Sequence, residues 1–290
     1  MKKLASSKGG MNIFVIIILA LLALIIFTLF LYKSYTNLQE SLAVQNCKVS
    51  IAAHAIVLQD TYRTIATNIK CPTREIMIPD LSKAKDTIAE DIHRCWYEWN
   101  KGDGEYFKGD GTFCHVCGIY AFNEKGKEVD GFVQYLNTQS IKVKYPGDNT
   151  GMTYINYLAP YKSAPNAPST AGSITTTDVL NTSKTYATIF IYSSDKSWLT
   201  KFFEGNGRLG TIAAGGAVVL IAGAAVMTSA VSVPIAIIAA GAGSGTVVTG
   251  IIGGNDFKYA AMIRFTEYNS TELDSFNCEN LAVSQVSTGK

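Results

Sequence analysis

The sequence predicts an α+β protein anchored in a membrane, with an N-terminal transmembrane helix and helical stalk, an antiparallel-sheet ectodomain braced by disulfides, and a Gly/Ala-rich apolar helical hairpin inserted before a late strand. Three observations predict this fold class. Residues 11–32 form an uncharged apolar run, and roughly 20 such residues span a bilayer as a helix. Residues 209–255 form a second uncharged stretch, rich in Gly, Ala, Val and Ile. All six cysteines lie outside both stretches, as expected for a disulfide framework in an exported domain.

The N-terminal apolar run sets the orientation of the chain. Lys2, Lys3 and Lys8 precede it, and basic residues favour the cytoplasmic side, so we expect the main domain to be extracytoplasmic. A cleaved secretory signal is the alternative, but this run exceeds the usual signal core and no small-residue cleavage site follows it. The predicted segments are a cytoplasmic N-terminus (1–10), a transmembrane helix (11–32), a helical stalk (33–70), an exported α+β domain (71–208), the apolar hairpin (209–255), and a return strand with the C-terminal tail of the exported domain (256–290).

The stalk is predicted because residues 11–70 contain neither Gly nor Pro, while Leu38, Leu42 and Val49 keep approximate helical spacing. A long N-terminal helix with an apolar first half, followed by a disulfide-bearing, β-rich head, resembles the plan of type IV pilins and their relatives. Lys8-Gly-Gly10 offers glycines before the apolar run, where prepilin leaders are cut, but Val15 stands where pilins usually carry Glu. The resemblance covers the architecture of the first 70 residues and implies pilin-like assembly.

Within the exported domain, an apolar face running from Leu81 to Trp99 predicts a helix that ends near Gly102, with Asp80 or Ser82 as its cap. We expect its tryptophans in the core or as membrane-interface anchors, and its carboxylates, such as Glu90 and Asp91, on a solvated face. Alternating or β-branched and aromatic residues predict the strands, and a short helix is expected over 132–136. The predicted strands are 75–78, 112–122, 140–145, 152–157, 184–192 and 257–265, with a surface loop over 160–177.

The apolar stretch 209–255 is about twice the length of one crossing and breaks near Pro234, which predicts two helices in a transmembrane or re-entrant hairpin. Strands on both sides indicate that it is inserted between neighbouring strands of one sheet, so both its ends emerge on the same side. A conditionally inserting segment, similar in composition to fusion peptides and pore-forming hairpins, and a core element buried in protein are the alternatives. Small residues at fourfold spacing would let another helix approach closely; they are Gly241, Gly245, Thr249 and Gly253.

The cysteines allow 15 pairings, among which the sequence does not choose. Cys278 can pair with the earlier cysteines only if residues 256–290 return to the exported side. Besides structural disulfides, two other roles are open: Cys114-His-Val-Cys117 is the best candidate for redox chemistry. A zinc site, which a cytoplasmic domain would favour, could use Cys71, Cys95, Cys114 and Cys117 as ligands, together with His54, His93 or His115. The disulfide candidates are Cys47, Cys71, Cys95, Cys114, Cys117 and Cys278.

The function expected from the sequence is a structural or interaction role in a cell envelope or at a cell surface, without catalysis and without a cofactor or metal. The net charge of +2, mixed along the chain, offers no basic face for nucleic acid. The expected partners are the lipid bilayer and either a second copy or another membrane protein, and sequons at Asn181 and Asn269 are glycosylation candidates. One alternative is a fusion-type or pore-type protein that inserts residues 209–255, and another is an extracytoplasmic thiol-disulfide oxidoreductase using Cys114 and Cys117.

Overall fold

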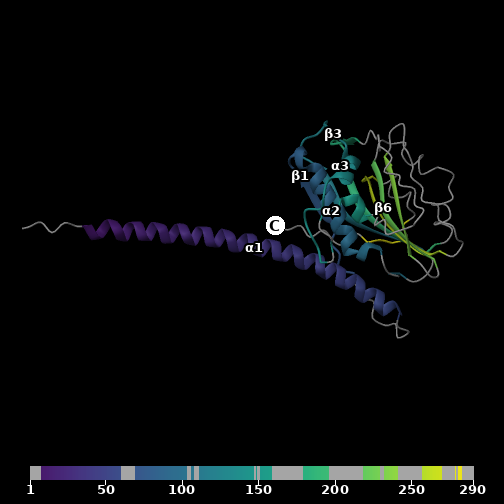
Figure 1. The fold of residues 1–290 in the computed structure, drawn as a ribbon, viewed down its shortest axis with the longest axis horizontal. Coiled ribbons are helices and arrows are strands. Elements are labelled where there is room, and N and C mark those ends of the chain that lie inside the picture. The colour runs from purple at the N-terminus through teal and green to yellow at the C-terminus, as the bar shows by residue number, and fades with distance from the viewer. Residues whose placement is uncertain are drawn as a thin grey trace, which may run out of the picture. The chain divides into compact units, whose positions relative to one another are not determined.

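The computed structural model has two compact units, Met1–Gln45 and Asn46–Lys290. The second unit is a mixed head of helices and sheet (Figure 1). The structure describes residues 8–59, 69–102, 106–107, 111–146, 148, 151–158, 179–195, 218–228, 232–240, 257–269, 278 and 280–282.

Helix α1, Lys8–Gln59, is the predicted long N-terminal helix. An 18-residue window within it has a mean hydropathy of 3.4, and 0% of that window is buried inside the protein. Side chains such as Phe14, Ile26 and Phe30 are each more than half exposed. By length and composition, α1 can therefore cross a membrane.

The last turns of α1 belong to the head and bury one face in its core. Cys47 and Ile51, four residues apart, are buried in the core of the head, whereas Val49 is exposed. Cys47 is bonded to Cys71, which fixes the rotation of the helix against the head. The approximate spacing of apolar residues in the sequence allowed several faces of these last turns to be the buried one. The Cys47–Cys71 disulfide selects one of them.

The sheet of the head is built around three antiparallel strands: β2 (Thr112–Phe122), β5 (Tyr186–Ser193) and β8 (Phe257–Glu267). β5 and β8 flank the apolar stretch in sequence and pair directly, which confirms that the stretch is inserted between neighbouring strands. The prediction of a purely antiparallel sheet is wrong at one edge. There β1 (Arg74–Ile78) and β9 (Asn280–Ala282) pair in parallel with two different halves of β2.

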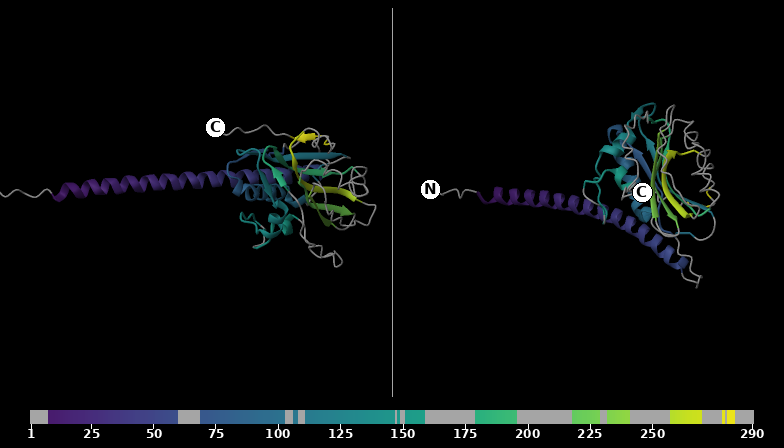
Figure 2. Two further views of the ribbon diagram at one scale, coloured as in Figure 1. Left: turned by 90° about the horizontal axis from the view of Figure 1, so that it is seen from above. Right: turned by 45° about the vertical axis from the view of Figure 1, so that its right-hand side comes forward.

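The apolar stretch forms strands where the structure describes it, so the prediction of two helices is wrong there. β6 (Val218–Thr228) pairs antiparallel with β8, and β7 (Ser232–Ala240) pairs antiparallel with β6, which extends the sheet beyond β8 (Figure 2). An uncharged run of Val, Ile and Ala suits a buried helix or a buried strand equally well. The edge of β8 supplies backbone partners, and β-branched residues then favour the strand.

Helix α2, Ala84–Glu98, packs on the sheet and confirms the predicted helix. Its N-terminal side follows the 3-10 turn η1 (Leu81–Lys83), where the Asp80 carboxylate accepts a hydrogen bond from the Ser82 N–H at 2.9 Å. Trp99 lies just past its end and stacks on Phe190 of β5 at a ring-centroid distance of 4.2 Å. Both tryptophans of this region, Trp96 and Trp99, are buried, so of the two predicted roles they take the one in the core.

Smaller elements cover the rest of the head. Helix α3 (Phe132–Thr138) confirms the short predicted helix, and β3 (Glu128–Asp130) pairs with β4 (Val179–Asn181) in a separate two-stranded sheet. The strands predicted over 140–145 and 152–157 are absent; Ser140 and Thr153 make an isolated bridge, and Tyr154–Leu158 is a short helix, α4. The buried residues of α4 follow the spacing of one helix face, with Asn156 exposed between Tyr154, Ile155 and Tyr157, Leu158. The loop predicted over 160–177 lies outside the described residues.

All six cysteines form disulfides, which confirms the predicted framework. The bonds are Cys47–Cys71, Cys95–Cys117 and Cys114–Cys278. The first joins α1 to the segment before β1, the second joins α2 to β2, and the third joins β2 to the segment before β9. Cys278 therefore pairs with an early cysteine, as the return of the C-terminal region to the head requires.

Candidate functional site

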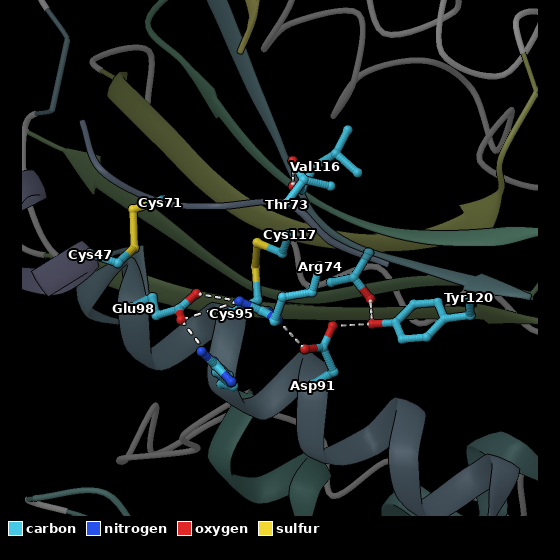
Figure 3. The surroundings of a disulfide bond; sticks show 12 residues. Cys47, Cys71, Thr73, Arg74, Asp91, Cys95, Glu98, Val116, Cys117 and Tyr120 are labelled. Atoms are coloured by element: carbon cyan, nitrogen blue, oxygen red, sulfur yellow. Dashed lines mark hydrogen bonds and ion pairs between the residues drawn. A yellow bond between two sulfur atoms is a disulfide. The ribbon is translucent and has the colours of Figure 1, made fainter. Parts of the chain in front are cut away.

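A buried charge network lies between β1 and α2. Arg74 of β1 donates from Nε to Asp91 Oδ1 at 2.5 Å, and from Nη1 to the two carboxylate oxygens of Glu98 at 3.2 and 3.1 Å. Figure 3 shows the Arg74 guanidinium between these two acids of α2. Asp91 and Glu98 are seven residues apart, or two helical turns, so they point to the same side of α2. One fork-shaped cation therefore ties both acids to the sheet.

The network is completed by groups on α2 and on the sheet. Arg94 Nε donates to Glu98 Oε1 at 2.9 Å within the helix. The hydroxyl of Tyr120 on β2 donates to Asp91 Oδ2 at 2.5 Å and lies 2.7 Å from the hydroxyl of Thr188 on β5. Asp91 is 6% exposed and Glu98 is 1% exposed. Two guanidinium groups thus balance two buried carboxylates, so each buried charge has a hydrogen-bonded partner of opposite sign.

Gly118 provides the space for this network on β2. A methyl group built there would lie 2.1 Å from Asp91 Oδ2 and 2.9 Å from the Tyr120 hydroxyl oxygen. The β2–β5 register shifts between Val116 and Gly118, which marks a bulge at this position. The missing side chain of Gly118 is therefore what lets the Asp91 carboxylate approach the sheet.

The electrostatics of the network raise the pKa values of two of its groups, Arg74 and Tyr120. Burial by itself would lower the pKa of Arg74, but the adjacent carboxylates of Asp91 and Glu98 outweigh it and raise the pKa. Burial, followed by the charge of Asp91, raises the pKa of Tyr120 well above its usual range. Arg74 therefore stays charged and Tyr120 stays protonated. Neither of these two groups changes its charge near neutral pH, so both hold the geometry of the network.

A second polar cluster lies where α2 faces residues 142–145, Asp148 and α4. His93 of α2 is fully buried, with Nε2 at 3.1 Å from Asp148 Oδ2 and Nδ1 at 3.8 Å from Glu90 Oε2. Glu90 Oε1 accepts hydrogen bonds from the N–H groups of Lys142 and Val143, at 3.1 and 3.2 Å, and from the Tyr154 hydroxyl. An imidazole between two carboxylates has the components of a proton relay, but here it is enclosed by protein.

Aromatic rings enclose this histidine. The His93 ring centroid lies 4.3 Å from that of Tyr157 and 5.1 Å from that of Tyr145, which itself stacks on Tyr97 at 4.4 Å. Lys101 Nζ lies 4.4 Å from the centroid of the Tyr157 ring and 3.8 Å from Asp148 Oδ1. Lys101 holds a left-handed backbone with φ of 59°, which is unusual for a residue other than Gly. The cluster therefore combines one buried histidine, two acids, one lysine and a tyrosine-rich wall.

The pKa shifts in the second cluster follow from its hydrogen bonds. Burial by itself would raise the pKa of Glu90, but nearby His93, the Tyr154 hydroxyl and two backbone N–H groups outweigh it and lower the pKa. Burial and the Glu90 carboxylate raise the pKa of Tyr154. Glu90 is thus held as an acceptor and Tyr154 as its donor.

The structure separates the two cysteines that the sequence offered for redox chemistry. Cys114 is bonded to Cys278 and Cys117 to Cys95, so the C-x-x-C pair does not close on itself. Among the residues that the structure describes, no group of three or more His, Cys, Asp and Glu side chains is placed to hold a metal. His115 lies 5.6 Å from Trp99 and His54 lies 5.7 Å from Phe107, in both cases between ring centroids.

The other predicted site residues lie apart from both clusters. Asn181, at the end of β4, is exposed, and its side-chain oxygen accepts from the Ser183 N–H at 2.9 Å. Asn269 follows β8 and is half-buried, and the remainder of its sequon lies outside the described residues. The predicted helix-packing ridge, Gly241, Gly245, Thr249 and Gly253, also lies outside them.

Sequence reasoning missed the charged network because it placed the α2 acids on a solvated face. A signal was present in the spacing, since Asp91, Arg94 and Glu98 follow one another at intervals of three and four residues. They flank the apolar stripe that contains Cys95, so they border the face that packs on the sheet. The partner on β1, Arg74, could not be assigned from that spacing because it comes from another element.

A comparison with known protein families, with curated proteins and with solved structures found no match for this chain.

Proposed function

We propose that this chain is a membrane-anchored protein of a cell envelope or cell surface, with an extracytoplasmic head that has a structural or interaction role and no catalytic activity. The observation that carries the proposal is the exposure of α1, because 0% of its most apolar window is buried inside the protein. A helix of the protein core would bury such a surface, whereas a bilayer accepts it on all sides.

The three disulfides support an extracytoplasmic position for the head. Such bonds persist in oxidising compartments and are rare where glutathione and thioredoxin keep thiols reduced. The lysines that precede the apolar run support a cytoplasmic N-terminus. A structural role agrees with the two polar clusters of α2, in which the acids are engaged by Arg74, Arg94 and the N–H groups of residues 142–143.

The test is fractionation of cells that express the full chain, followed by protease treatment of intact spheroplasts. We expect the chain to stay with membranes after an alkaline wash, and the head to be cleaved only by protease added outside. The matched control replaces residues 1–32 with a cleavable export signal, and we expect this variant to leave the membrane. The proposal would be contradicted if the alkaline wash removed the full chain from the membranes. It would also be contradicted if the head resisted protease added to intact spheroplasts.

The alternative functions are separated by two further assays on the same protein. Release of a dye from liposomes over a range of lipid compositions and pH values would favour a fusion-type or pore-type protein. Exchange with a model peptide disulfide that depends on Cys114 and Cys117 would favour an oxidoreductase. We expect neither activity, because β6 and β7 pair within the sheet and the two cysteines are bonded to different partners.

A further inference from the structure

One segment of the head is attached to α2 by side-chain carboxylates rather than by backbone pairing. We call this segment the strap and define it as residues 140–146 together with Asp148. It lies over the side of α2 that carries Glu90, His93 and Tyr97. Among its described members, Ile141 is the one apolar side chain that is buried, and Lys142, Val143 and Lys144 are exposed.

The hydrogen bonds of the strap fall into two kinds. The N–H groups of Lys142 and Val143 donate to Glu90 Oε1, and the N–H of Tyr145 donates to Asp148 Oδ2 at 2.9 Å. By contrast, the N–H of Ile141 donates to a backbone oxygen, that of Met152, at 3.0 Å. The strength of the first kind depends on carboxylate charge, because a charged acceptor makes a hydrogen bond roughly twice as strong. The second kind does not depend on charge.

Other titratable groups face the strap from every element around it. His93 of α2 lies between Glu90 and Asp148, and Lys101 of η2 (Asn100–Gly102) lies near Asp148. Tyr154 and Tyr157 come from α4, and Tyr135 of α3 donates to Asp86 Oδ1 at 2.7 Å. Lys142 Nζ lies 2.6 Å from Asp86 Oδ1. Protonation of Glu90 removes its attraction for His93 and weakens its hydrogen bonds to the strap.

We propose that the strap is an acid-released element, in which loss of the charge on Glu90 frees residues 140–146 from α2 while the disulfide-braced sheet stays folded. Glu90 is the acceptor for two strap N–H groups and for Tyr154, so its charge affects three bonds at once. Release would uncover His93 and Tyr97, which are both buried beneath the strap in this structure.

The direction of the pH dependence follows from the pKa of Glu90, which is lowered because its hydrogen bonds outweigh the effect of burial. A carboxylate with a lowered folded-state pKa contributes its full stability above the ordinary value of about 4.3, and loses it as the pH falls through the folded-state pKa. The strap should therefore stay attached at neutral pH and detach in an acidic medium.

The experiment is hydrogen exchange with mass spectrometry on the full chain in detergent, between pH 6.5 and pH 3, with labelling times scaled for the intrinsic exchange rate. We expect protection of the strap peptide to fall about tenfold or more across this range. Peptides from β2 and β5 should keep their protection. Equal loss in the strap and the sheet would indicate global unfolding and overturn the proposal.

Two variants make the assignment to Glu90 specific. Glu90→Gln keeps an acceptor oxygen of similar shape without a titratable charge, so its strap protection should be lower at pH 6.5 and should fall less steeply with pH than that of the original protein. Asp86→Asn is the matched control, since Asp86 contacts the Lys142 side chain and Tyr135 but no strap N–H. It should keep the pH dependence of the original protein. The proposal would be refuted if strap protection in the original protein did not change with pH. It would equally be refuted if Glu90→Gln left the pH dependence of strap protection unchanged, or if Asp86→Asn abolished it.

Discussion

Replacing Arg74 with Met should strongly destabilise the head. The change removes one bond to Asp91 at 2.5 Å and two to Glu98 at 3.1 and 3.2 Å, and leaves both acids in a site where they are 6% and 1% exposed. Removing one partner of a buried ion pair costs about 3–5 kcal/mol, because the remaining charge is uncompensated. A typical domain has only about 5–15 kcal/mol of total stability, so the loss is large.

Urea unfolding of the full chain in detergent, followed by tryptophan fluorescence, measures this loss. Trp96 and Trp99 are buried in the head and report on its unfolding. With a slope of about 2 kcal/mol per molar urea, the midpoint should fall by about 1.5–2.5 M.

The matched control for Arg74→Met is Lys184→Met, which removes a pair of 2.7 Å with Glu267 at a partly exposed site. It should cost only about 0.2–1 kcal/mol. Adding Asp91→Asn to Arg74→Met should recover part of the stability, because Glu98 stays paired with Arg94 and Asp91 no longer contributes an uncompensated carboxylate. An Arg74→Met midpoint equal to that of Lys184→Met would refute the reasoning.

Two further changes test the packing and the second cluster. Gly118→Ala should lower the free energy of unfolding by about 1–3 kcal/mol in the same urea assay, because its methyl group overlaps Asp91 Oδ2. The loss should largely disappear when Asp91 is already replaced by Ala. An equal loss in that background would exclude this clash as the cause. Tyr154→Phe should cost about 1.5–3 kcal/mol at neutral pH by removing a bond to a charged acceptor. Its cost should shrink as the pH falls through the lowered pKa of Glu90, because the charge that strengthens the bond is then lost. A cost that stays constant from pH 7 to pH 3 would argue against an ionised Glu90 as the acceptor.

The candidate site was only partly readable from the sequence. The apolar face of α2 placed Cys95 and Trp96 in the core, and the structure confirms this. The acids beside that face looked solvated because their spacing fits an exposed helix as well as a paired one. What distinguishes Asp91 is Arg74 on β1 and the space above Gly118 on β2, and both come from elements remote in sequence.

By itself, the sequence determined the elements whose signal is local. An uninterrupted apolar run without Gly or Pro specified α1, an amphipathic stripe specified α2, and β-branched alternation specified β2 with the bounds Thr112–Phe122. Tertiary structure decided everything that depends on a partner. The 15 cysteine pairings reduced to one set, and the parallel edge formed by β1 and β9 required β2. Residues 218–228 and 232–240 became strands because β8 offered an open edge. The physical reason is that backbone hydrogen bonds of a helix are satisfied within the segment, whereas those of a strand are satisfied by a neighbour that the local sequence does not name.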